Sequence, residues 1–284
     1  MNVIIDWLSQ IISQHEPEGE IVYLSSLNKC VTMKDTALQG KDVRIQGCED
    51  SYIYIDTNVH YMQISNCVNC TVLIAAVNKT CSIDKCENVT VCVASNFLRI
   101  GNCVDCTVYS YTQLAPPIIY GDTRNLQMAP HNTSYFELLS HLRSADIMFI
   151  PPITGSTPSP FQPSASAKAL VSENIHNFAK SIILTGFSSS CYSLLQPVDF
   201  MKLSLPKKYS EQPLFLCPQE YTEVLAIRQE HFKEIQQKIK GAQLSPDQEK
   251  MLHVAIQGYF REWFVQSNQY KPITELVRMI DQEF

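Results

Sequence analysis

The feature that most constrains this 284-residue chain is a motif that occurs four times between residues 45 and 112. Each copy opens with an isoleucine, has a cysteine three residues later and an Asp or Asn two residues after that. The successive cysteines, 19, 19 and 17 residues apart, are Cys48, Cys67, Cys86 and Cys103. One copy is too short to bury its own apolar face, so the copies must stack as a solenoid.

The residue types in each copy select the kind of solenoid. Ile, Val, Thr and Tyr favour strands, and a copy of this length has no room for a helix as well. We therefore predict a mainly β fold with some α structure, built on a parallel β-helix. Because side chains alternate along a strand, two apolar columns should point inward. These columns are Ile45, Ile64, Ile83 and Ile100, and Ile53, Val72, Val91 and Val108.

The Asp or Asn that follows each cysteine predicts a corner of the β-helix. These residues tolerate left-handed backbone and can hydrogen-bond to nearby backbone. They are Asp50, Asn69, Asn88 and Asp105.

Two incomplete copies flank the four. Residues 27–30 place Cys30 18 residues before Cys48, and residues 119–122 place Asp122 where a cysteine is expected. We expect an N-terminal helix and a capping coil within residues 1–40. The β-helix itself is expected within residues 41–145.

The cysteines allow more than one interpretation. Nine of the eleven lie between Cys30 and Cys106, and the pairs Cys67/Cys70 and Cys103/Cys106 have a spacing typical of zinc ligands. The repeat explains their first members without a metal, since Cys86 holds the same place with no partner three residues on. We expect a column of buried, reduced thiols rather than a zinc site or disulfides, and no cofactor.

The chain after the repeat changes character. Residues 131–144 carry leucines at helical spacing and predict a helix that begins at an N-cap of Asn132 or Thr133. Residues 151–168 are rich in Pro and Ser and predict a disordered linker or long loop. Residues 169–217 are less clear, with 182–184 and 200–205 as possible edge strands or pieces that lie on the solenoid.

Residues 218–267 predict a helical hairpin within a C-terminal region that spans residues 169–284. Apolar residues follow a helical period from residue 218 to Gly241, and a second helix starts at Pro246 after Ser245. Residues 272–284 predict a third, short helix. The apolar faces of these helices either pack on one another or on the β-helix, or bind a partner.

Charge and hydropathy exclude several classes of protein. The net charge of −6 gives no electrostatic reason to expect nucleic-acid binding. The sequence contains no run of 18 apolar residues, so it predicts no membrane-spanning helix. Residues 1–13 read as a short amphipathic helix and lack the basic start of a signal peptide, so we expect an intracellular protein.

Several segments resemble a known domain family. The segments GCEDSYIY (residues 47–54) and VTVCVAS (89–95) resemble the C-CAP/cofactor C-like domain of the tubulin-binding cofactor C superfamily. LQMAPHNTSY (126–135) looks like the segment that closes this domain. The resemblance implies that the parallel β-helix is right-handed. In the tail, AQLSPDQE (242–249) and YFREW (259–263) are similar to the TBCC domain-containing protein 1 family.

The resemblance implies a function and a relation to longer proteins. It implies a non-enzymatic scaffold of the cytoplasm and cytoskeleton, at the centrosome, spindle pole or basal body, with a role in Golgi and organelle positioning. Members of the narrower family carry a longer N-terminal part, so we expect this chain to be a short form or a fragment of a larger protein. Actin binding, known from a more distant relative without the helical tail, ranks last.

One arginine raises an alternative. GTPase-activating members of the superfamily use the arginine of a Gln-x-Arg-x-His motif on a β-helix strand. Arg99 stands at that arginine, whereas Phe97 replaces the Gln and Gly101 replaces the His. The resemblance therefore leaves open a GTPase activator for tubulin or an Arf-like small GTPase, with Arg99 as the arginine finger. A plain surface arginine is the simplest interpretation.

The repeat also predicts where Arg99 points. Because Ile100 is an inward residue, Arg99 should face outward. The same outer column holds Arg44, three coils away and on the order of 14 Å distant at the spacing of neighbouring strands. We predict a partner-binding surface that comprises Arg99, Arg44, Gln63 and Phe97.

Overall fold

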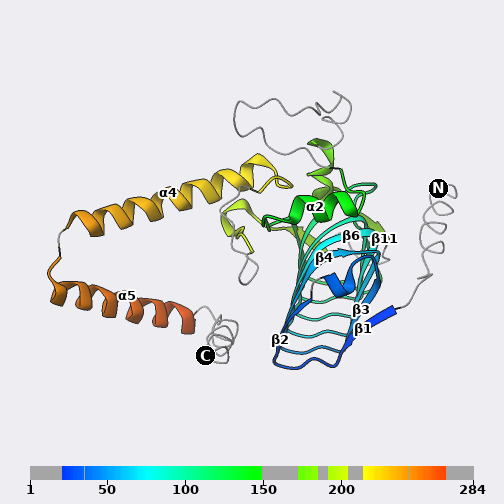
Figure 1. The fold of residues 1–284 in the computed structure, drawn as a ribbon, viewed down its shortest axis with the longest axis horizontal. Helices are drawn as coiled ribbons and strands as arrows, with labels where there is room; N and C mark the ends of the chain where they lie inside the picture. The colour runs from blue at the N-terminus through cyan, green and yellow to red at the C-terminus, as the bar shows by residue number, and fades with distance from the viewer. Residues whose placement is uncertain are drawn as a thin grey trace. The chain divides into compact units, whose positions relative to one another are not determined.

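The computed structural model describes residues 21–34, 36–148, 172–184, 191–203, 214–242 and 244–266. The chain divides into two compact units, residues 1–222 and 223–284. The first unit is a parallel β-solenoid, visible as stacked strands in Figure 1. The predicted N-terminal helix, the linker at residues 151–168 and the third helix at 272–284 lie outside the described residues.

The solenoid has two long faces made of parallel strand ladders. Face A consists of β1 (Ile21–Ser25), β3 (Asp42–Gln46), β5 (Tyr61–Ser65), the ends of β6 (Thr71–Asp84) and β7 (Thr90–Gly101), β9 (Ile118–Tyr120) and β11 (Ile182–Leu184). Face B consists of β2 (Val31–Lys34), β4 (Tyr52–Val59), the first halves of β6 and β7, β8 (Thr107–Thr112), β10 (Leu126–Pro130) and β12 (Tyr192–Leu194). The predicted parallel β-helix is confirmed.

Apolar columns fill the interior between the two faces. The four leading isoleucines are fully buried, and so is the column that Ile53 starts on face B. Burying such a side chain is worth about 1.5–3 kcal/mol, so the stacked columns supply most of the driving force for the fold. The inward assignment made from alternation is confirmed.

The corner between the faces is a short ladder of isolated parallel bridges. Next to it, Asp50, Asn69, Asn88 and Asp105 all have left-handed backbone, with φ between 47° and 54°. Their side chains form a ladder: Asn69 Nδ2 donates to Asp50 Oδ1 at 2.9 Å, and Asn88 Nδ2 donates to Asn69 Oδ1 at 2.8 Å. The predicted corner is confirmed.

A second left-handed column, which the sequence reasoning missed, lies just before the cysteines. Its φ values run from 52° to 64°. Its members are Ser26, Gly47, Asn66, Lys85, Asn102 and Gly121. The sequence does not predict this column because its residue types are mixed, and serine and lysine are not typical of positive φ.

The alignment of both flanking copies needs correction. Val31 pairs with Tyr52, and the backbone N–H of Cys30 donates to Ser51 Oγ at 3.3 Å. Cys30 therefore lies beside Ser51, and not beside Cys48 as the 18-residue spacing suggested. The first coil is longer than the others, so counting residues misplaced it.

At the other end, Ile119 pairs with Ile100 as expected. The place of the cysteine belongs to Thr123, which is 3% exposed and accepts a hydrogen bond from the Cys103 backbone N–H at 3.5 Å. Asp122 is exposed. One extra residue in this turn moves the inward position from Asp122 to Thr123.

The helix predicted over residues 131–144 is shorter than expected. Helix α2 spans Leu138–Ser144 and its N-cap is Glu137, so the assignment of Asn132 or Thr133 as N-cap is wrong. Asn132 Nδ2 donates to the Met201 carbonyl at 2.9 Å, and Thr133 Oγ1 donates to the Leu203 carbonyl at 3.0 Å. These bonds to a distant segment compete with helix capping. α2 packs on β4 and β6.

The described residues between 172 and 222 add a final coil to the solenoid. β11 pairs with β9, as suggested for residues 182–184, and the unforeseen β12 pairs with β10. In the suggested strand 200–205, the described residues provide only an isolated bridge, between Leu203 and Thr133. The rings of Tyr109 and Tyr221 lie 6.0 and 5.0 Å from that of the fully buried Phe200.

The C-terminal helices match the sequence within one residue. α4 spans Gln219–Gly241 and α5 spans Pro246–Gln266. Ser245 Oγ accepts from the Gln248 N–H at 3.4 Å, while Gln248 Oε1 accepts from the Ser245 N–H at 2.9 Å, which is a capping box. Apolar side chains on both helices, Phe232 and Tyr259 among them, are exposed. No described helix is long and apolar enough to cross a membrane.

Candidate functional site: an outer stripe on face A

Five residues form one column on the outside of face A. Strand register pairs Arg44 with Gln63, Gln63 with Ser82, and Ser82 with Arg99. Tyr23 precedes Arg44 in the same column. We call these five residues the outer stripe. At about 4.8 Å per strand, the three steps from Arg44 to Arg99 span about 14 Å.

Arg99 faces outward, and its side chain lies along the surface. Its neighbours Leu98 and Ile100 are 1% and 0% exposed, whereas Arg99 is half-buried. Arg99 Nε donates to Ser82 Oγ at 2.9 Å, on the preceding coil. Ser82 is only 5% exposed. The guanidinium is thus tied to the stripe rather than extended straight into solvent.

Arg44 is held in a similar way at the other end. Its Nη1 donates to the Tyr23 hydroxyl at 3.3 Å, and its Cζ lies 5.9 Å from the centre of that ring. This geometry permits a cation–π contact. Among the described residues, neither Arg44 nor Arg99 forms an ion pair. Both positive charges therefore remain available to a partner.

Phe97, the remaining predicted contact residue, lies in the adjacent outer column. It pairs with Thr80 in the register that pairs Arg99 with Ser82, and it is half-buried. The structure therefore brings all four predicted residues to one face. Whether they bind a partner stays a prediction.

Tyr120 is a residue of this site that the sequence reasoning missed. It comes from the next coil, and its ring lies directly over Gly101: a Cβ at position 101 would be 2.2 Å from Tyr120 Cζ. The Tyr120 hydroxyl donates to Asp84 Oδ1 at 3.2 Å, and Asn102 Nδ2 donates to the same oxygen at 2.8 Å. Burial, and then the charge of Asp84, raises the pKa of Tyr120 to about 12.

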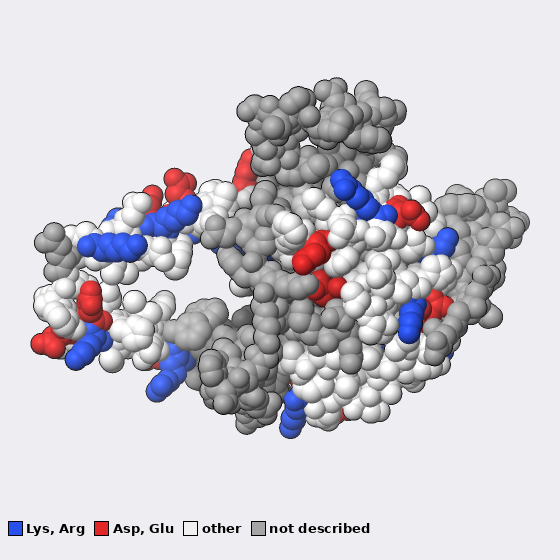
Figure 2. All heavy atoms as spheres, viewed as in Figure 1, with Lys and Arg blue, Asp and Glu red and all other residues white. Residues whose placement is uncertain are grey.

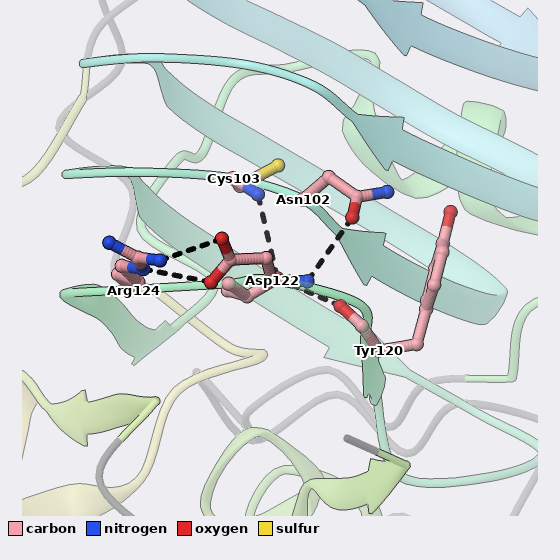
Figure 3. A network of polar contacts seen from close by, with 6 residues as sticks. Asn102, Cys103, Tyr120, Asp122 and Arg124 are labelled. Atoms are coloured by element: carbon pink, nitrogen blue, oxygen red, sulfur yellow. Dashed lines mark hydrogen bonds and ion pairs between the residues drawn. The ribbon is translucent and has the colours of Figure 1, made fainter. Parts of the chain in front are cut away.

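The turn after β9 fixes the position of Tyr120 (Figure 3). The Asp122 N–H donates to Asn102 Oδ1 at 3.1 Å, and Thr123 Oγ1 donates to the Tyr120 carbonyl at 2.9 Å. Arg124 donates two hydrogen bonds of 2.8 Å to the Asp122 carboxylate. Tyr120 thus fills the space that a histidine at position 101 would need. The glycine that ends β7 was the available sequence signal, since a glycine in a strand often marks the close approach of another group.

The cysteines inside the solenoid donate weak hydrogen bonds to backbone carbonyls. Cys67 Sγ lies 3.4 Å from the Ser65 carbonyl oxygen, and Cys103 Sγ lies 3.1 Å from that of Gly101. Burial raises the pKa of both Cys81 and Cys92 to about 12. Within the described ranges no group of three or more His, Cys, Asp or Glu residues is placed to hold a metal ion. That the thiols stay reduced in the cell remains a prediction.

A polar cluster beneath α2 has a structural role. Tyr135 and His141 share a hydrogen bond of 2.9 Å between the hydroxyl and Nδ1, and Asp56 Oδ1 lies 4.0 Å from the same nitrogen. This cluster joins α2 to β4.

His131 lies in the segment before α2, and burial lowers its pKa to about 3.

On the face drawn in Figure 2, the Lys and Arg of the described residues are interspersed with Asp and Glu rather than gathered into one broad patch. We identify the outer stripe by the register that aligns Arg44 and Arg99 in one outer column.

Comparison with known proteins agrees with the architecture. The family model described as "Tubulin binding cofactor C" matches residues 40–152. TBCC domain-containing protein 1 of Danio rerio is 24% identical over 92% of this chain, that of Mus musculus 26% over 90%, and that of Homo sapiens 23% over 90%. The chain spans only 42–43% of the length of these relatives.

The resemblance inferred from the repeat and the tail is therefore confirmed. The matched region coincides with the solenoid coils from β3 to α2, and the similarity to the curated relatives continues over nearly the whole chain. Residues 40–152 match the family model of tubulin binding cofactor C, and the chain that contains them is similar to TBCC domain-containing protein 1.

Proposed function

We propose that this protein is a non-enzymatic, cytoskeleton-associated scaffold that contacts a partner protein through the outer stripe. The observation that carries the proposal is the position of Arg99. Its guanidinium lies along face A and is bonded to Ser82, so it is arranged to meet a partner's surface. The absence of a compensating carboxylate at either stripe arginine, among the described residues, supports the same conclusion.

The surroundings of Arg99 favour binding over catalysis. An arginine finger must place its guanidinium on the charge that develops at a transferring phosphate. Phe97 and Gly101 flank Arg99 and offer no polar side chain to orient it there. Tyr120 covers Gly101 and directs its hydroxyl to Asp84 instead.

The family match supports a candidate partner and a candidate cellular location. The matched family is described as tubulin binding, so tubulin is the first candidate partner. The proposed locations are the centrosome, the spindle pole or the basal body, in the cytoplasm, with an effect on Golgi positioning. Imaging of the tagged chain in dividing cells tests this part of the proposal. Diffuse signal throughout mitosis would contradict it.

Binding to purified tubulin tests the role of the stripe. We expect Arg44→Glu and Arg99→Glu each to weaken binding at least about tenfold, since each change replaces an attraction with a repulsion. Lys79→Glu is the matched control, because Lys79 is exposed on β6 outside the stripe. Equal affinity for all three variants and the wild type would overturn the assignment of the stripe as the interface.

The second candidate function is GTPase activation, which the half-exposed outward position of Arg99 favours. A single-turnover GTPase assay with tubulin and Arf-like small GTPases separates the two candidates. We expect no stimulation. An increase of about 10³-fold or more that Arg99→Ala abolishes would establish an arginine finger and reject the purely structural role.

A further inference from the structure

We infer that the outer stripe binds an extended acidic segment of its partner that presents two carboxylates four residues apart. The inference rests on the proposed function, because it assumes that the stripe is a binding surface. It adds the chemistry and the conformation of the bound segment.

The charge of the stripe selects carboxylates. Arg44 and Arg99 each use one N–H in a bond to a neutral hydroxyl, on Tyr23 and Ser82 respectively. A guanidinium has five N–H donors, so four remain on each for a carboxylate.

The two acidic residues nearest in the neighbouring columns are already engaged. Asp42 lies 3.0 Å from His60 Nδ1, and Asp84 accepts from Asn102 and Tyr120. Neither forms an ion pair with a stripe arginine. An acidic ligand therefore needs to displace no internal ion pair at the stripe.

The distance between the arginines selects the conformation. An extended chain advances about 3.3 Å per residue, so residues i and i+4 are about 13 Å apart and point to the same side. That matches the separation of about 14 Å along the stripe. On a helix, positions on one side lie about 10.5 Å apart at i+7 or 16.5 Å at i+11, and neither fits.

The residues between the arginines suit a passing backbone. Gln63 is half-buried, lies one coil from Arg44 and makes no side-chain hydrogen bond to any described residue. Its amide can both donate to and accept from a peptide group. Ser82 is occupied by Arg99. The stripe thus offers one adaptable polar group between two fixed charges.

A single phosphate fits less well. Two arginines about 14 Å apart cannot converge on one phosphate group, whose oxygens span only a few ångströms. Two separate carboxylates, one for each arginine, match this separation.

Arginine side-chain NMR on the full chain tests the inference directly. The probes are nine-residue Gly/Ser peptides with two Glu residues at i,i+4, at i,i+3 or at i,i+2, and an i,i+4 Gln peptide. We expect the i,i+4 Glu peptide to shift the Nε–H resonances of both Arg44 and Arg99. Its affinity should exceed that of the i,i+2 and i,i+3 peptides by about threefold, because an exposed ion pair contributes little to the binding free energy.

Variants assign the resonances and control for charge. Arg44→Gln and Arg99→Gln should each remove the preference for i,i+4, whereas Lys79→Gln should keep it. Equal affinity for all Glu spacings, a shift of only one arginine, or equal binding of the Gln peptide would overturn the inference.

The outcomes also separate this inference from the proposed function. Stripe-dependent tubulin binding together with peptides that fail the spacing test would reject only the extended acidic segment. Spacing-dependent peptide binding without tubulin binding would instead reject tubulin as the partner.

Discussion

At the scale of single residues, Gly101 and Tyr120 decide the character of face A beside Arg99. A glycine at position 101 leaves room for the ring of Tyr120 from the next coil. The ring in turn carries a hydroxyl to Asp84, where Asn102 also donates. A side chain at position 101 would meet the Tyr120 ring, so the ring would have to move to make room for it. A histidine at position 101 is therefore incompatible with the observed position of Tyr120.

Gly101→Ala should destabilise the solenoid by about 1–3 kcal/mol, the usual cost of overpacking a filled site. The reason is the 2.2 Å approach between a new Cβ and Tyr120 Cζ. Denaturant unfolding followed by circular dichroism measures the change.

Gly258→Ala is the matched control, because a Cβ there meets nothing within 4 Å. It should leave the solenoid transition unchanged. In the Tyr120→Ala background, Gly101→Ala should lose most of its cost. A full effect in that background would show that Tyr120 is not the cause.

His131 predicts a pH dependence. Burial holds its folded-state pKa at about 3, below the unfolded value of about 6.5. The unfolded state therefore binds a proton that the folded state refuses, and the free energy of unfolding falls as pH drops from about 6.5 toward 3. The slope from this residue is about 1.4 kcal/mol per pH unit.

His131→Gln should remove that slope between pH 4 and 6, measured as the difference in free energy of unfolding from the wild type. His231→Gln, at an exposed position on α4, should keep the wild-type slope. Parallel curves for His131→Gln and wild type would contradict a buried, neutral His131.

At the scale of elements, the corners make the coils stackable. Each coil turns through two left-handed residues, and the Asx column adds side-chain hydrogen bonds between coils. Asn and Asp suit this corner twice, since they adopt positive φ and carry the bonding groups. This requirement explains why an Asp or Asn recurs at the same place in each copy of the motif.

Asn88→Ala and Asn88→Gly separate the two contributions. Glycine keeps the backbone at φ 51° but loses the bond to Asn69, at a cost of about 0.5–1.5 kcal/mol. Alanine also strains the backbone and should cost about 1 kcal/mol more. Chemical denaturation of both variants measures the difference. Equal stability would mean that the left-handed backbone costs alanine nothing here.

At the scale of the whole molecule, the solenoid is completed by a segment far away in sequence. Asn174 and Asn177 donate to the Gln113 and Thr112 carbonyls at 2.9 Å each, and Phe200 fills the space between Tyr109 and Tyr221. The described residues of this segment therefore cover the open end of the stack. The helical unit that follows is largely exposed.

Truncation tests this division. A chain that ends at Thr222 should keep the thermal midpoint of the solenoid, because the removed helices bury little of their surface. A chain that ends at residue 148 should unfold at a lower temperature or aggregate, since it exposes Tyr109 and the edges of β9 and β10. Differential scanning calorimetry compares the two. Equal midpoints would show that residues 172–222 do not stabilise the solenoid.

The sequence by itself determined the parallel β-helix, its inward columns, the Asx corner, the outward position of Arg99 and the limits of α4 and α5. All of these depend on local periodicity, which each copy carries within about 20 residues. The tertiary structure alone decided the registers of Cys30 and Thr123, the late start of α2, the final coil and the contact of Tyr120 with Gly101. Those depend on which coil lies on which, and a single inserted residue shifts that stacking without disturbing the local pattern.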